Sequence, residues 1–396
     1  INLLPVEENA TAGRMRNIQP KMLNDNTFEI EVENEIIISV SFVGGCAGST
    51  GGGVKVSRVV ILLKSARREI KKLAHPNSVS NIKMDGDTLD EDVVKGVKVF
   101  RENDCDAILA IGGGSAIDVA KCIKLYSKMD DNALYLEQEY KDNEVLLIAI
   151  PTTSGTGSES TRYAVIYYDN KKQSVTHESI IPAYALLDYR ALFTLPEYQK
   201  KCTMVDAFCQ SIESWWSVNA NSESREYSRK ALSMILDNMK AYLENTEEGN
   251  RNMLIAANYA GKAINITQTT AAHAMSYKLT SQYGVPHGRA AFICLPYVWK
   301  YMWEHIDMLS SELGKKLEEL FQQIAQTLYC SSVSEALEYI FTLNKKLFEK
   351  DKVIMNSEDV GLLAGSVNAT RLKNNPMVLS EKTLQDLYSN IVQSYN

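Results

Sequence analysis

The chain has 396 residues, of which 45% are hydrophobic and 23% charged, as expected for a soluble globular protein with room for two domains. Its formal net charge of −7 argues against nucleic acid as the main partner, because nucleic-acid-binding proteins usually present a basic face. The seven cysteines form no CxxC pair, so the sequence indicates neither a disulfide framework nor a zinc knuckle and favours the cytoplasm.

Residues 1–90 form an atypical N-terminal segment. The run IIISVSF, starting at Ile36, favours a strand, and SRVVILLKSARREIKKLAH, starting at Ser57, predicts a basic amphipathic helix. The glycines between these runs are a weak nucleotide motif, because GxGxxG matches arise easily where glycine is frequent. No membrane span is expected, since Lys55 and Arg58 interrupt the most apolar stretch and a span needs about 18 or more uncharged residues.

Residues 91–193 predict a dinucleotide-binding α/β domain. The helical pattern EDVVKGVKVFREN precedes the strand DAILAIG, the helix AIDVAKCIKLYSK, the strand LLIAIP and the apolar run YAVIYY. Such alternation indicates a parallel sheet, although its usual first strands are not recognisable and the sheet is expected to be incomplete. Residues 194–396 show long helical patterns and few glycines, which predict an all-α domain.

Two glycine-rich loops follow successive strands, IGGGSAIDVAK (Ile111–Lys121) and PTTSGTGSES (Pro151–Ser160). Glycines at the start of a helix let the backbone approach a pyrophosphate, which the free helix N–H groups then bind. One such loop is equally well explained as a tight strand–helix turn. Two of them at neighbouring carboxyl ends of a sheet predict a ligand crevice.

Four side chains of the helical domain form a candidate metal set. Asp206 and Gln210 lie one turn apart on a predicted helix, while His273 comes from a second helix and His287 from the loop that follows it. Aspartate and histidine from separate segments are typical divalent-metal ligands. Because an amide oxygen binds Zn²⁺ or Fe²⁺ less strongly than imidazole does, Gln210 is either a fourth ligand or a hydrogen-bonding group behind the ligands.

Three aromatic residues near this set have open roles. Tyr277 lies one turn after His273, where it either relays a proton or packs. Trp215 and Trp216 are interpreted as core or domain-interface residues.

Residues 91–396 resemble the iron-containing (group III) alcohol dehydrogenase family through four motifs in order, GGGSAID, PTTSGTGSE, DAFCQSIES and HAMSY…PHG. The resemblance implies an N-terminal nucleotide domain, a C-terminal helical domain, a metal in the cleft between them, and NAD(P)-dependent interconversion of an alcohol and an aldehyde. It assigns the cofactor contacts to Gly113, Gly114, Ser115, Asp118, Thr152, Thr153, Thr156 and Lys172. It assigns Fe or Zn to Asp206, Gln210, His273 and His287. The candidate catalytic residues are His273 and, from its own position, Tyr277.

The chain departs from this family at two positions, since Gln210 and Tyr277 stand where the family usually has histidine. The runs DAFCQSIESWWS, NITQTTAAHAMSYK and CLPYVWKYM are most similar to the phosphonoacetaldehyde reductase branch, which implies reduction of phosphonoacetaldehyde to 2-hydroxyethylphosphonate. A dianionic substrate needs a positive anchor, for which Arg162 is the first candidate and Lys278 and Arg289 are alternatives.

Residues 38–95 instead resemble the last filter loop and following helix of a Trk-type potassium-transporter subunit, so the chain is interpreted as a chimera. Three readings therefore compete: an aldehyde reductase of this or another substrate, an inactive remnant, and a transporter fragment. For the enzyme, the expected partners are a small aldehyde or alcohol and a second copy of the chain in a homodimer.

Overall fold

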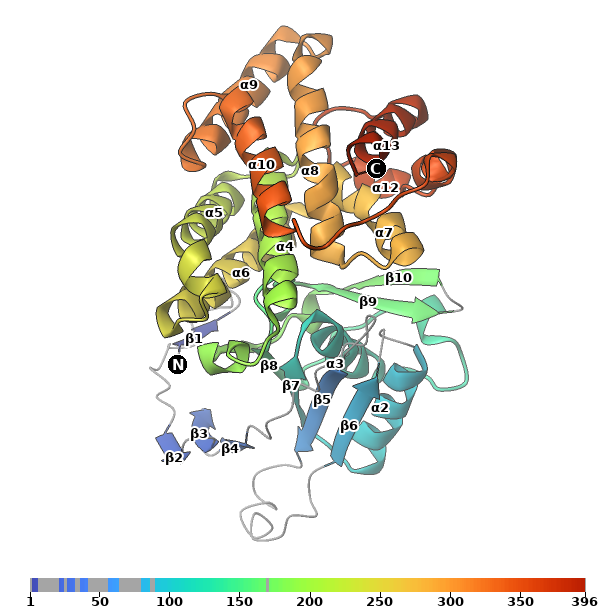
Figure 1. The fold of residues 1–396 in the computed structure, drawn as a ribbon. Helices are drawn as coiled ribbons and strands as arrows, with labels where there is room; N and C mark the ends of the chain where they lie inside the picture. The colour runs from blue at the N-terminus through green and yellow to red at the C-terminus, as the bar shows by residue number, and fades with distance from the viewer. Residues whose placement is uncertain are drawn as a thin grey trace. The chain divides into compact units, whose positions relative to one another are not determined.

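The computed structural model describes residues 2–5, 21–24, 27–32, 36–41, 56–63, 80–85, 90–168 and 171–395. The chain divides into two compact units, each coloured along the chain in Figure 1. An α/β unit comprises Ile1–Thr153 and Ser158–Leu195, and a helical unit comprises Ser154–Gly157 and Pro196–Asn396.

The α/β unit contains eleven strands among the described residues. They are β1 (Asn2–Pro5), β2 (Lys21–Asn24), β3 (Thr27–Val32), β4 (Ile36–Ser41), β5 (Val56–Leu63), β6 (Ser80–Asp85), β7 (Ala107–Gly112), β8 (Leu146–Pro151), β9 (Tyr163–Tyr168), β10 (Lys171–Thr176) and β11 (Tyr184–Leu187). Its two α-helices in the same part of the chain are α2 (Asp90–Glu102) and α3 (Gly114–Tyr126).

Six strands form the main sheet, in the order β1-β11-β8-β7-β5-β6. The three middle strands β11, β8 and β7 run parallel, whereas β1, β5 and β6 pair antiparallel. The predicted α/β class is confirmed, with antiparallel strands added at both sides of the parallel centre. Since Gly112 pairs with Pro151 at the ends of β7 and β8, the two glycine loops start at the same level of the sheet.

Two local predictions in this unit are wrong. Residues 56–63 form strand β5 between β6 and β7 instead of the start of a helix, because periodicity cannot distinguish a short apolar run in a strand from one in a helix. The basic run 64–72 and the glycine stretch 44–53 lie outside the described residues. The predicted strand at Ile36 is confirmed as β4, in a separate three-stranded sheet with β2 and β3.

The run YAVIYY is a strand, β9, but it pairs with β10 in a hairpin and is not part of the main sheet. Only a short 3₁₀ turn, Ser158–Ser160, lies between β8 and β9. A parallel connection needs a crossover of a dozen or more residues, so the third parallel strand is β11, which comes later in the chain.

Helix α3 forms the centre of the unit's core. It contacts α2, β7, β8 and β9, and its buried side chains include Ile117, Val119 and Tyr126. Because it begins directly after β7, packing of this helix fixes the position of the first glycine loop.

The helical unit contains ten α-helices among the described residues. They are α4 (Glu197–Trp216), α5 (Ser222–Leu243), α6 (Glu247–Thr267), α7 (Ala271–Tyr283), α8 (His287–Glu304), α9 (Ser311–Thr327), α10 (Val333–Leu347), α11 (Val360–Gly365), α12 (Ala369–Leu372) and α13 (Glu381–Tyr395). Several of them begin with a polar capping residue. At the start of α5, Asn221 and Ser224 form a capping box, in which the side chain of each bonds the backbone of the other. The predicted all-α character of this region is confirmed.

Helix α4 runs through the middle of the unit and packs against α5, α6 and α8 (Figure 1). Trp216 at its end lies 5.6 Å from Trp299 and 5.7 Å from Phe321, measured between ring centroids. Trp215 and Trp216 are both buried, which agrees with a core role for the two. Within the described ranges, no helix combines the length and apolar character required to cross a membrane.

Candidate metal and cofactor site

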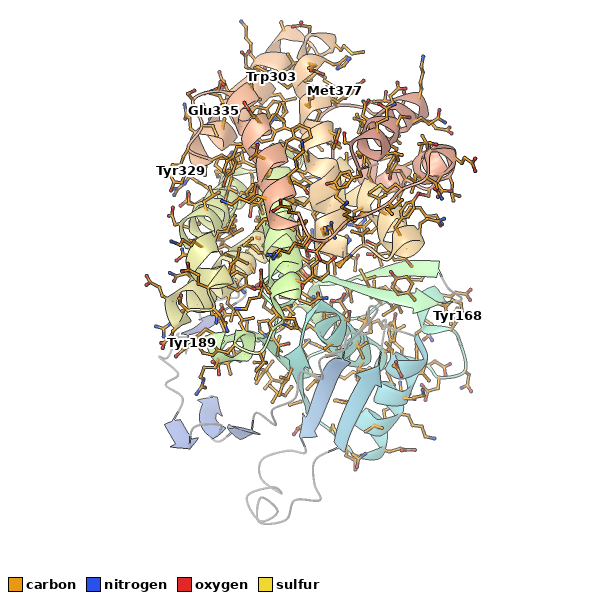
Figure 2. All side chains as sticks on the ribbon, in the orientation of Figure 1. Tyr168, Tyr189, Trp303, Tyr329, Glu335 and Met377 are labelled. Carbon is orange, nitrogen blue, oxygen red and sulfur yellow. The ribbon has the colours of Figure 1, made fainter. Side chains whose placement is uncertain are left out.

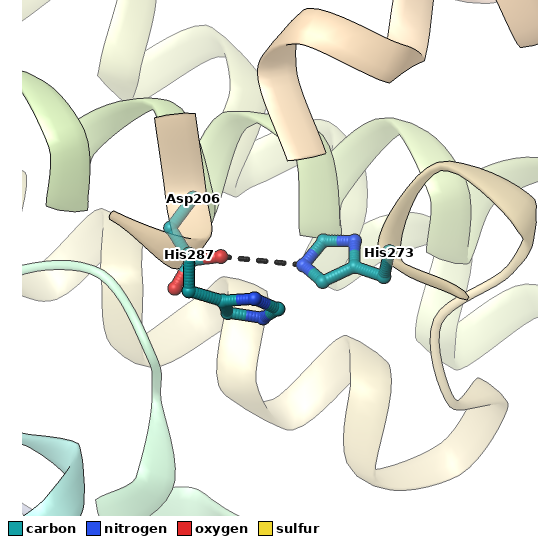
Figure 3. Close-up of side chains that lie close together, drawn as sticks. All are labelled: Asp206, His273 and His287. Atoms are coloured by element: carbon teal, nitrogen blue, oxygen red, sulfur yellow. Dashed lines mark hydrogen bonds and ion pairs between the residues drawn. The ribbon is translucent and has the colours of Figure 1, made fainter. Parts of the chain in front are cut away.

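Three predicted metal ligands converge in the helical unit. Asp206 of α4, His273 of α7 and His287 of α8 present ligand atoms that all lie within 4.8 Å of one another. Figure 3 shows the three side chains, with the bond of 3.2 Å between His273 Nε2 and Asp206 Oδ1 as a dashed line. Asp206 and His273 are buried, and His287 is half-buried.

Close packing of α8 on α4 brings His287 to this place. Helix α7 ends at Gly284, whose φ of +65° is the left-handed conformation common at helix ends. Pro286 then precedes His287, which is the first residue of α8 and not part of a loop as predicted. A Cβ on Gly288 would lie 2.2 Å from the Cys202 carbonyl oxygen, so only glycine permits this approach.

Glu213 is a site residue that sequence reasoning missed. Its Oε2 accepts a hydrogen bond from His273 Nδ1, and its Oε1 accepts bonds of 2.7 Å from the Thr270 hydroxyl and 3.0 Å from the Thr270 amide. A carboxylate on one ring nitrogen of a ligating histidine orients the other nitrogen toward the metal. Position 213 lies two turns after Asp206, so helical spacing was the available signal.

Glu213 and His273 each shift the pKa of the other. Burial alone would lower the pKa of His273, but the carboxylates of Glu213 and Asp206 outweigh burial and raise this pKa to about 9. Burial alone would raise the pKa of Glu213, and the charge and hydrogen bonds of His273 lower it instead. Without a cation the pair is therefore imidazolium and carboxylate at neutral pH, and a cation would take the place of the Nε2 proton.

Gln210 is one turn after Asp206 on α4, and the nitrogen and oxygen of its side-chain amide lie in different surroundings. Its Nε2 donates to the Thr156 carbonyl oxygen at 3.4 Å. Its Oε1 is buried, and no donor from the described residues lies within hydrogen-bond distance. A buried acceptor without a partner is costly, and a nearby cation would satisfy it.

Tyr277 stacks on His287. The two rings are 5.3 Å apart between centroids and inclined by 3°. Burial raises the pKa of Tyr277, so the phenol stays protonated at neutral pH. Tyr277 thus lies beside the ligand set with a hydroxyl that keeps its proton.

The residues present fit a divalent cation. One carboxylate and two imidazoles are the ligand types of iron and zinc sites, and Glu213 fixes the orientation of one imidazole. The orphan Oε1 of Gln210 adds a neutral oxygen on the same helix as Asp206.

The first glycine loop and the start of the second, Thr152 and Thr153, lie side by side in the α/β unit. A Cβ on Gly113 would be 3.3 Å from the Thr153 side chain, and the Thr152 amide donates to the Gly112 carbonyl oxygen at 2.9 Å. Gly113 caps α3, and Gly114 and Ser115 open its first turn, which contains no acidic residue. An N-terminal turn without acids beside a hydroxyl-rich loop suits a pyrophosphate.

The remainder of the second loop, Ser154–Gly157, belongs to the helical unit. Ser154 Oγ is 2.6 Å from the Tyr242 hydroxyl, and Gln210 holds the Thr156 carbonyl. Gly157 has φ of +61°, and a Cβ there would lie 2.4 Å from Gly261 Cα. The loop is thus packed directly on α6.

Gly261→Ala is expected to lower the free energy of unfolding by about 1–3 kcal/mol, because the new methyl group would lie 2.6 Å from the Gly157 carbonyl oxygen. Urea denaturation measures this change. Gly361→Ala on α11 is the matched control, since a Cβ there meets nothing within 4 Å. Equal stabilities of the two variants would contradict the close packing.

Asp118 and Lys172, the other predicted cofactor contacts, lie near each other in the α/β unit. Asp118 accepts hydrogen bonds from Ser158 Oγ at 2.5 Å and the Val165 amide at 2.9 Å, and the charge of Lys172 acts on this carboxylate. Burial raises the pKa of Asp118. Both oxygens of Asp118 therefore help to hold α3 against β9 and the second loop.

Lys121 is a second residue that the sequence reasoning missed. Its buried ammonium donates to Ser158 Oγ and Thr161 Oγ1, both at 3.0 Å, and to the Tyr163 carbonyl oxygen at 2.8 Å. Burial lowers its pKa to about 8. Lys121 thus links α3 to the end of the second loop.

The three predicted anion anchors lie in different surroundings. Arg162 forms an ion pair with Glu178 in the α/β unit. Arg289 is buried in the helical unit, where it donates to the Tyr198 hydroxyl and the Asp351 carbonyl oxygen. Lys278 follows Tyr277 on α7 and is half-buried.

A surface hollow of about 510 Å³ lies elsewhere in the helical unit. Tyr329 and Glu335, labelled in Figure 2, are among its lining residues, together with Leu236 and Tyr339. None of the predicted site residues in the described part of the chain lines it.

Fold and site together define a class: an α/β unit with paired glycine loops and a helical unit with a metal-ligand set, as in metal-dependent dehydrogenases. Residues 53–189 match the family model of iron-containing alcohol dehydrogenase, and residues 201–392 match the C-terminal model of the same family. The chain belongs to the iron-containing alcohol dehydrogenase family. The match takes in most of residues 38–95, where β5 and β6 belong to the main sheet.

Individual relatives agree with this assignment. The chain is 30% identical to 4-hydroxybutyrate dehydrogenase of Clostridium kluyveri, over 71% of the chain and 76% of that enzyme. It is 26% identical to NADPH-dependent butanol dehydrogenase of Clostridium saccharobutylicum, over 85% of this chain and 84% of that enzyme. Two other relatives are matched over only part of their own length, 36% of one and 55% of the other. The crystal structure of an iron-containing alcohol dehydrogenase from Thermotoga maritima superposes with a TM-score of 0.67 at 27% identity, over 83% of this chain and 88% of that one.

The family defines an oxidoreductase that interconverts alcohols and aldehydes with NAD(P)H and a divalent metal such as iron, so the predicted enzyme class and cofactors are confirmed. Its members act on small molecules, as the names of these relatives state.

Proposed function

We propose that this chain reduces a small aldehyde with an acid group at its far end, with phosphonoacetaldehyde as first candidate and 2-hydroxyethylphosphonate as product. The observation that carries the proposal is the set of Asp206, His273 and His287, of which the first two are buried, with Glu213 behind His273. The name of the Clostridium kluyveri relative supports the substrate class, because 4-hydroxybutyrate bears a carboxylate opposite its hydroxyl.

In this proposal residues 91–193 bind the dinucleotide and residues 194–396 hold metal and substrate. Gly113, Gly114 and Ser115 receive the pyrophosphate at the start of α3, and the adjoining loop adds its threonines. The remaining cofactor contacts are Asp118, Thr152, Thr153, Thr156 and Lys172. These residues orient the nicotinamide, and hydride transfer is the chemistry of the cofactor itself.

Asp206, His273 and His287 would hold the cation, with Gln210 Oε1 as a fourth, weaker ligand. A bound divalent cation supplies Lewis acidity, which polarises the carbonyl oxygen of the aldehyde. Glu213 keeps Nε2 of His273 directed at the ligand set. Tyr277, protonated and stacked on His287, is the candidate relay for the proton that the new alkoxide takes up.

The test is oxidation of NADH or NADPH by the purified chain with phosphonoacetaldehyde, succinate semialdehyde and propionaldehyde, with and without added Fe²⁺ or Zn²⁺. Turnover that depends on metal and is fastest with an acid-bearing aldehyde is expected. Absence of turnover with all three would favour the inactive-remnant reading, and preference for propionaldehyde would place the chain among dehydrogenases of uncharged substrates.

Gln210→His is expected to strengthen metal binding at least tenfold, because imidazole is a better ligand for Fe²⁺ and Zn²⁺ than an amide oxygen. Competition against a chelator of known affinity measures the change. Gln210→Ala, which removes the orphan oxygen, should bind metal no more tightly than the unsubstituted chain. Equal affinity of the histidine variant and the unsubstituted chain would place the side chain of residue 210 outside the ligand set.

We also propose a homodimer in the cytoplasm. None of the six cysteines that the structure describes forms a disulfide, which supports a reducing compartment. Analytical ultracentrifugation of the full chain tests the assembly.

A further inference from the structure

Arg371 on α12 has its guanidinium next to the candidate site, and no carboxylate within the described ranges pairs with it. Its Cζ lies 5.6 Å from the centroid of the Tyr277 ring, and α12 contacts α7, which carries Tyr277. Tyr277 in turn stacks on His287. One aromatic ring therefore connects Arg371 to the ligand set.

The side chain of Arg371 makes no ion pair or hydrogen bond with any residue that the structure describes. It is only half-buried, and the face of the tyrosine ring offsets part of the cost of removing the charge from water. The Asn368 side chain, which caps α12, accepts hydrogen bonds from the backbone amides of Thr370 and Arg371. The backbone of Arg371 is therefore fixed, and its guanidinium is available to bind an anionic ligand.

The chemistry of the guanidinium decides what that partner is. A guanidinium that contacts an aromatic ring keeps its N–H groups at the edge of its plane, where they form paired bonds with a carboxylate, sulfonate or phosphonate. The two arginines proposed from sequence differ from Arg371 in this respect, because Arg162 is paired with Glu178 and Arg289 donates to the Asp351 carbonyl oxygen.

We propose that Arg371 is the specificity-determining residue that binds the acid group of the substrate while the carbonyl end lies at Asp206, His273 and His287. The proposal rests on the proposed function, since it names the residue that recognises the acid-bearing end of the aldehyde. Tyr277 holds the guanidinium in place and separates it from the reacting end.

The test measures binding separately from turnover. Titration calorimetry of 2-hydroxyethylphosphonate and 4-hydroxybutyrate into the full chain with NADH, which cannot take up a hydride from either alcohol, gives the Kd for the unsubstituted chain and for Arg371→Met. Loss of a charge-assisted pair should raise Kd roughly 10- to 100-fold. Lys373→Met, an exposed lysine on the same segment, is the matched control and should leave Kd unchanged.

Unchanged Kd in Arg371→Met would overturn the proposal, and so would failure of the unsubstituted chain to bind either acid. Arg371→Gln replaces the methionine variant if the latter melts early. Kinetics separate the two claims, because Arg371→Met should lose more kcat/KM with the acid-bearing aldehydes than with the uncharged propionaldehyde. Binding of the acids without turnover of any aldehyde would sink the proposed function and leave the anion site standing.

Discussion

Replacing Asp206 by asparagine is expected to abolish binding of the divalent metal and to lower aldehyde turnover on the order of a thousandfold. The asparagine has the same shape but supplies a neutral oxygen, so the ligand set loses its negative charge. A metal that polarises a carbonyl contributes several kcal/mol, and each 1.36 kcal/mol is a factor of ten in rate. Metal content by plasma mass spectrometry and single-turnover rates check the two effects.

Asp188→Asn is the control for Asp206→Asn. Asp188 is also fully buried, but its oxygens bond Arg190 at 2.7 Å in the α/β unit. This variant should lose stability and keep its metal. Retention of a full metal equivalent by Asp206→Asn would contradict the proposed ligand set.

Glu213→Gln is expected to weaken metal binding about 10- to 100-fold, although Glu213 is not itself a ligand. In the variant the glutamine oxygen takes the place of Oε1, because this atom accepts from the backbone amides of Thr270 and His273. The NH₂ group then faces His273 Nδ1, which becomes an acceptor, and the ring proton moves to Nε2. Nε2 is the atom that faces Asp206, and its proton must be lost before a cation binds. Chelator competition gives the affinity, and between pH 6.5 and 9 the pH dependence of that affinity should be shallower than in the unsubstituted chain, because His273 no longer has an imidazolium proton to release.

The same pair predicts the pH dependence of stability in the metal-free protein. The raised pKa of His273 contributes stability that is complete below its ordinary value of 6.5 and is lost as pH rises through about 9. The lowered pKa of Glu213 contributes stability that is present above its ordinary value of 4.5 and is lost as the pH falls through the folded value. Chelator-treated protein should therefore lose unfolding free energy, on the order of 3 kcal/mol, between pH 6.5 and 9.

Urea denaturation at several pH values checks this loss. Glu213→Gln should flatten the decline, because the neutral amide no longer favours the imidazolium. An unaltered slope in this variant would show that Glu213 does not hold the proton on His273.

Ligand types and helical spacing were sufficient to predict Asp206, His273 and His287, because each lies at a recognisable place in a local pattern. Their convergence was predicted from ligand type and family resemblance and not from local pattern, since it depends on the close approach of Gly288 to α4, a tertiary contact. Glu213 had a local signal, two turns after Asp206, that was not used. Arg371 had none, because α12 is a four-residue helix 94 positions after Tyr277 and shows no periodicity.

Some strands, likewise, were predictable from local sequence, and others depend on tertiary contacts. β7 and β8 were predictable as apolar runs that end in glycine loops. β5 was not, because its apolar run VVILL suits a helix or a strand equally well until β7 is present beside it.

The allocation of Ser154–Gly157 to the helical unit has a consequence for dissection of the protein. The family models divide the chain between residues 189 and 201, yet a fragment that starts at Pro196 would lack the four residues that cover Gly261 and bond Tyr242. The amide of Gln210 would also lose its acceptor. The boundary visible in sequence is therefore not one at which the polypeptide can be cut into two self-sufficient pieces.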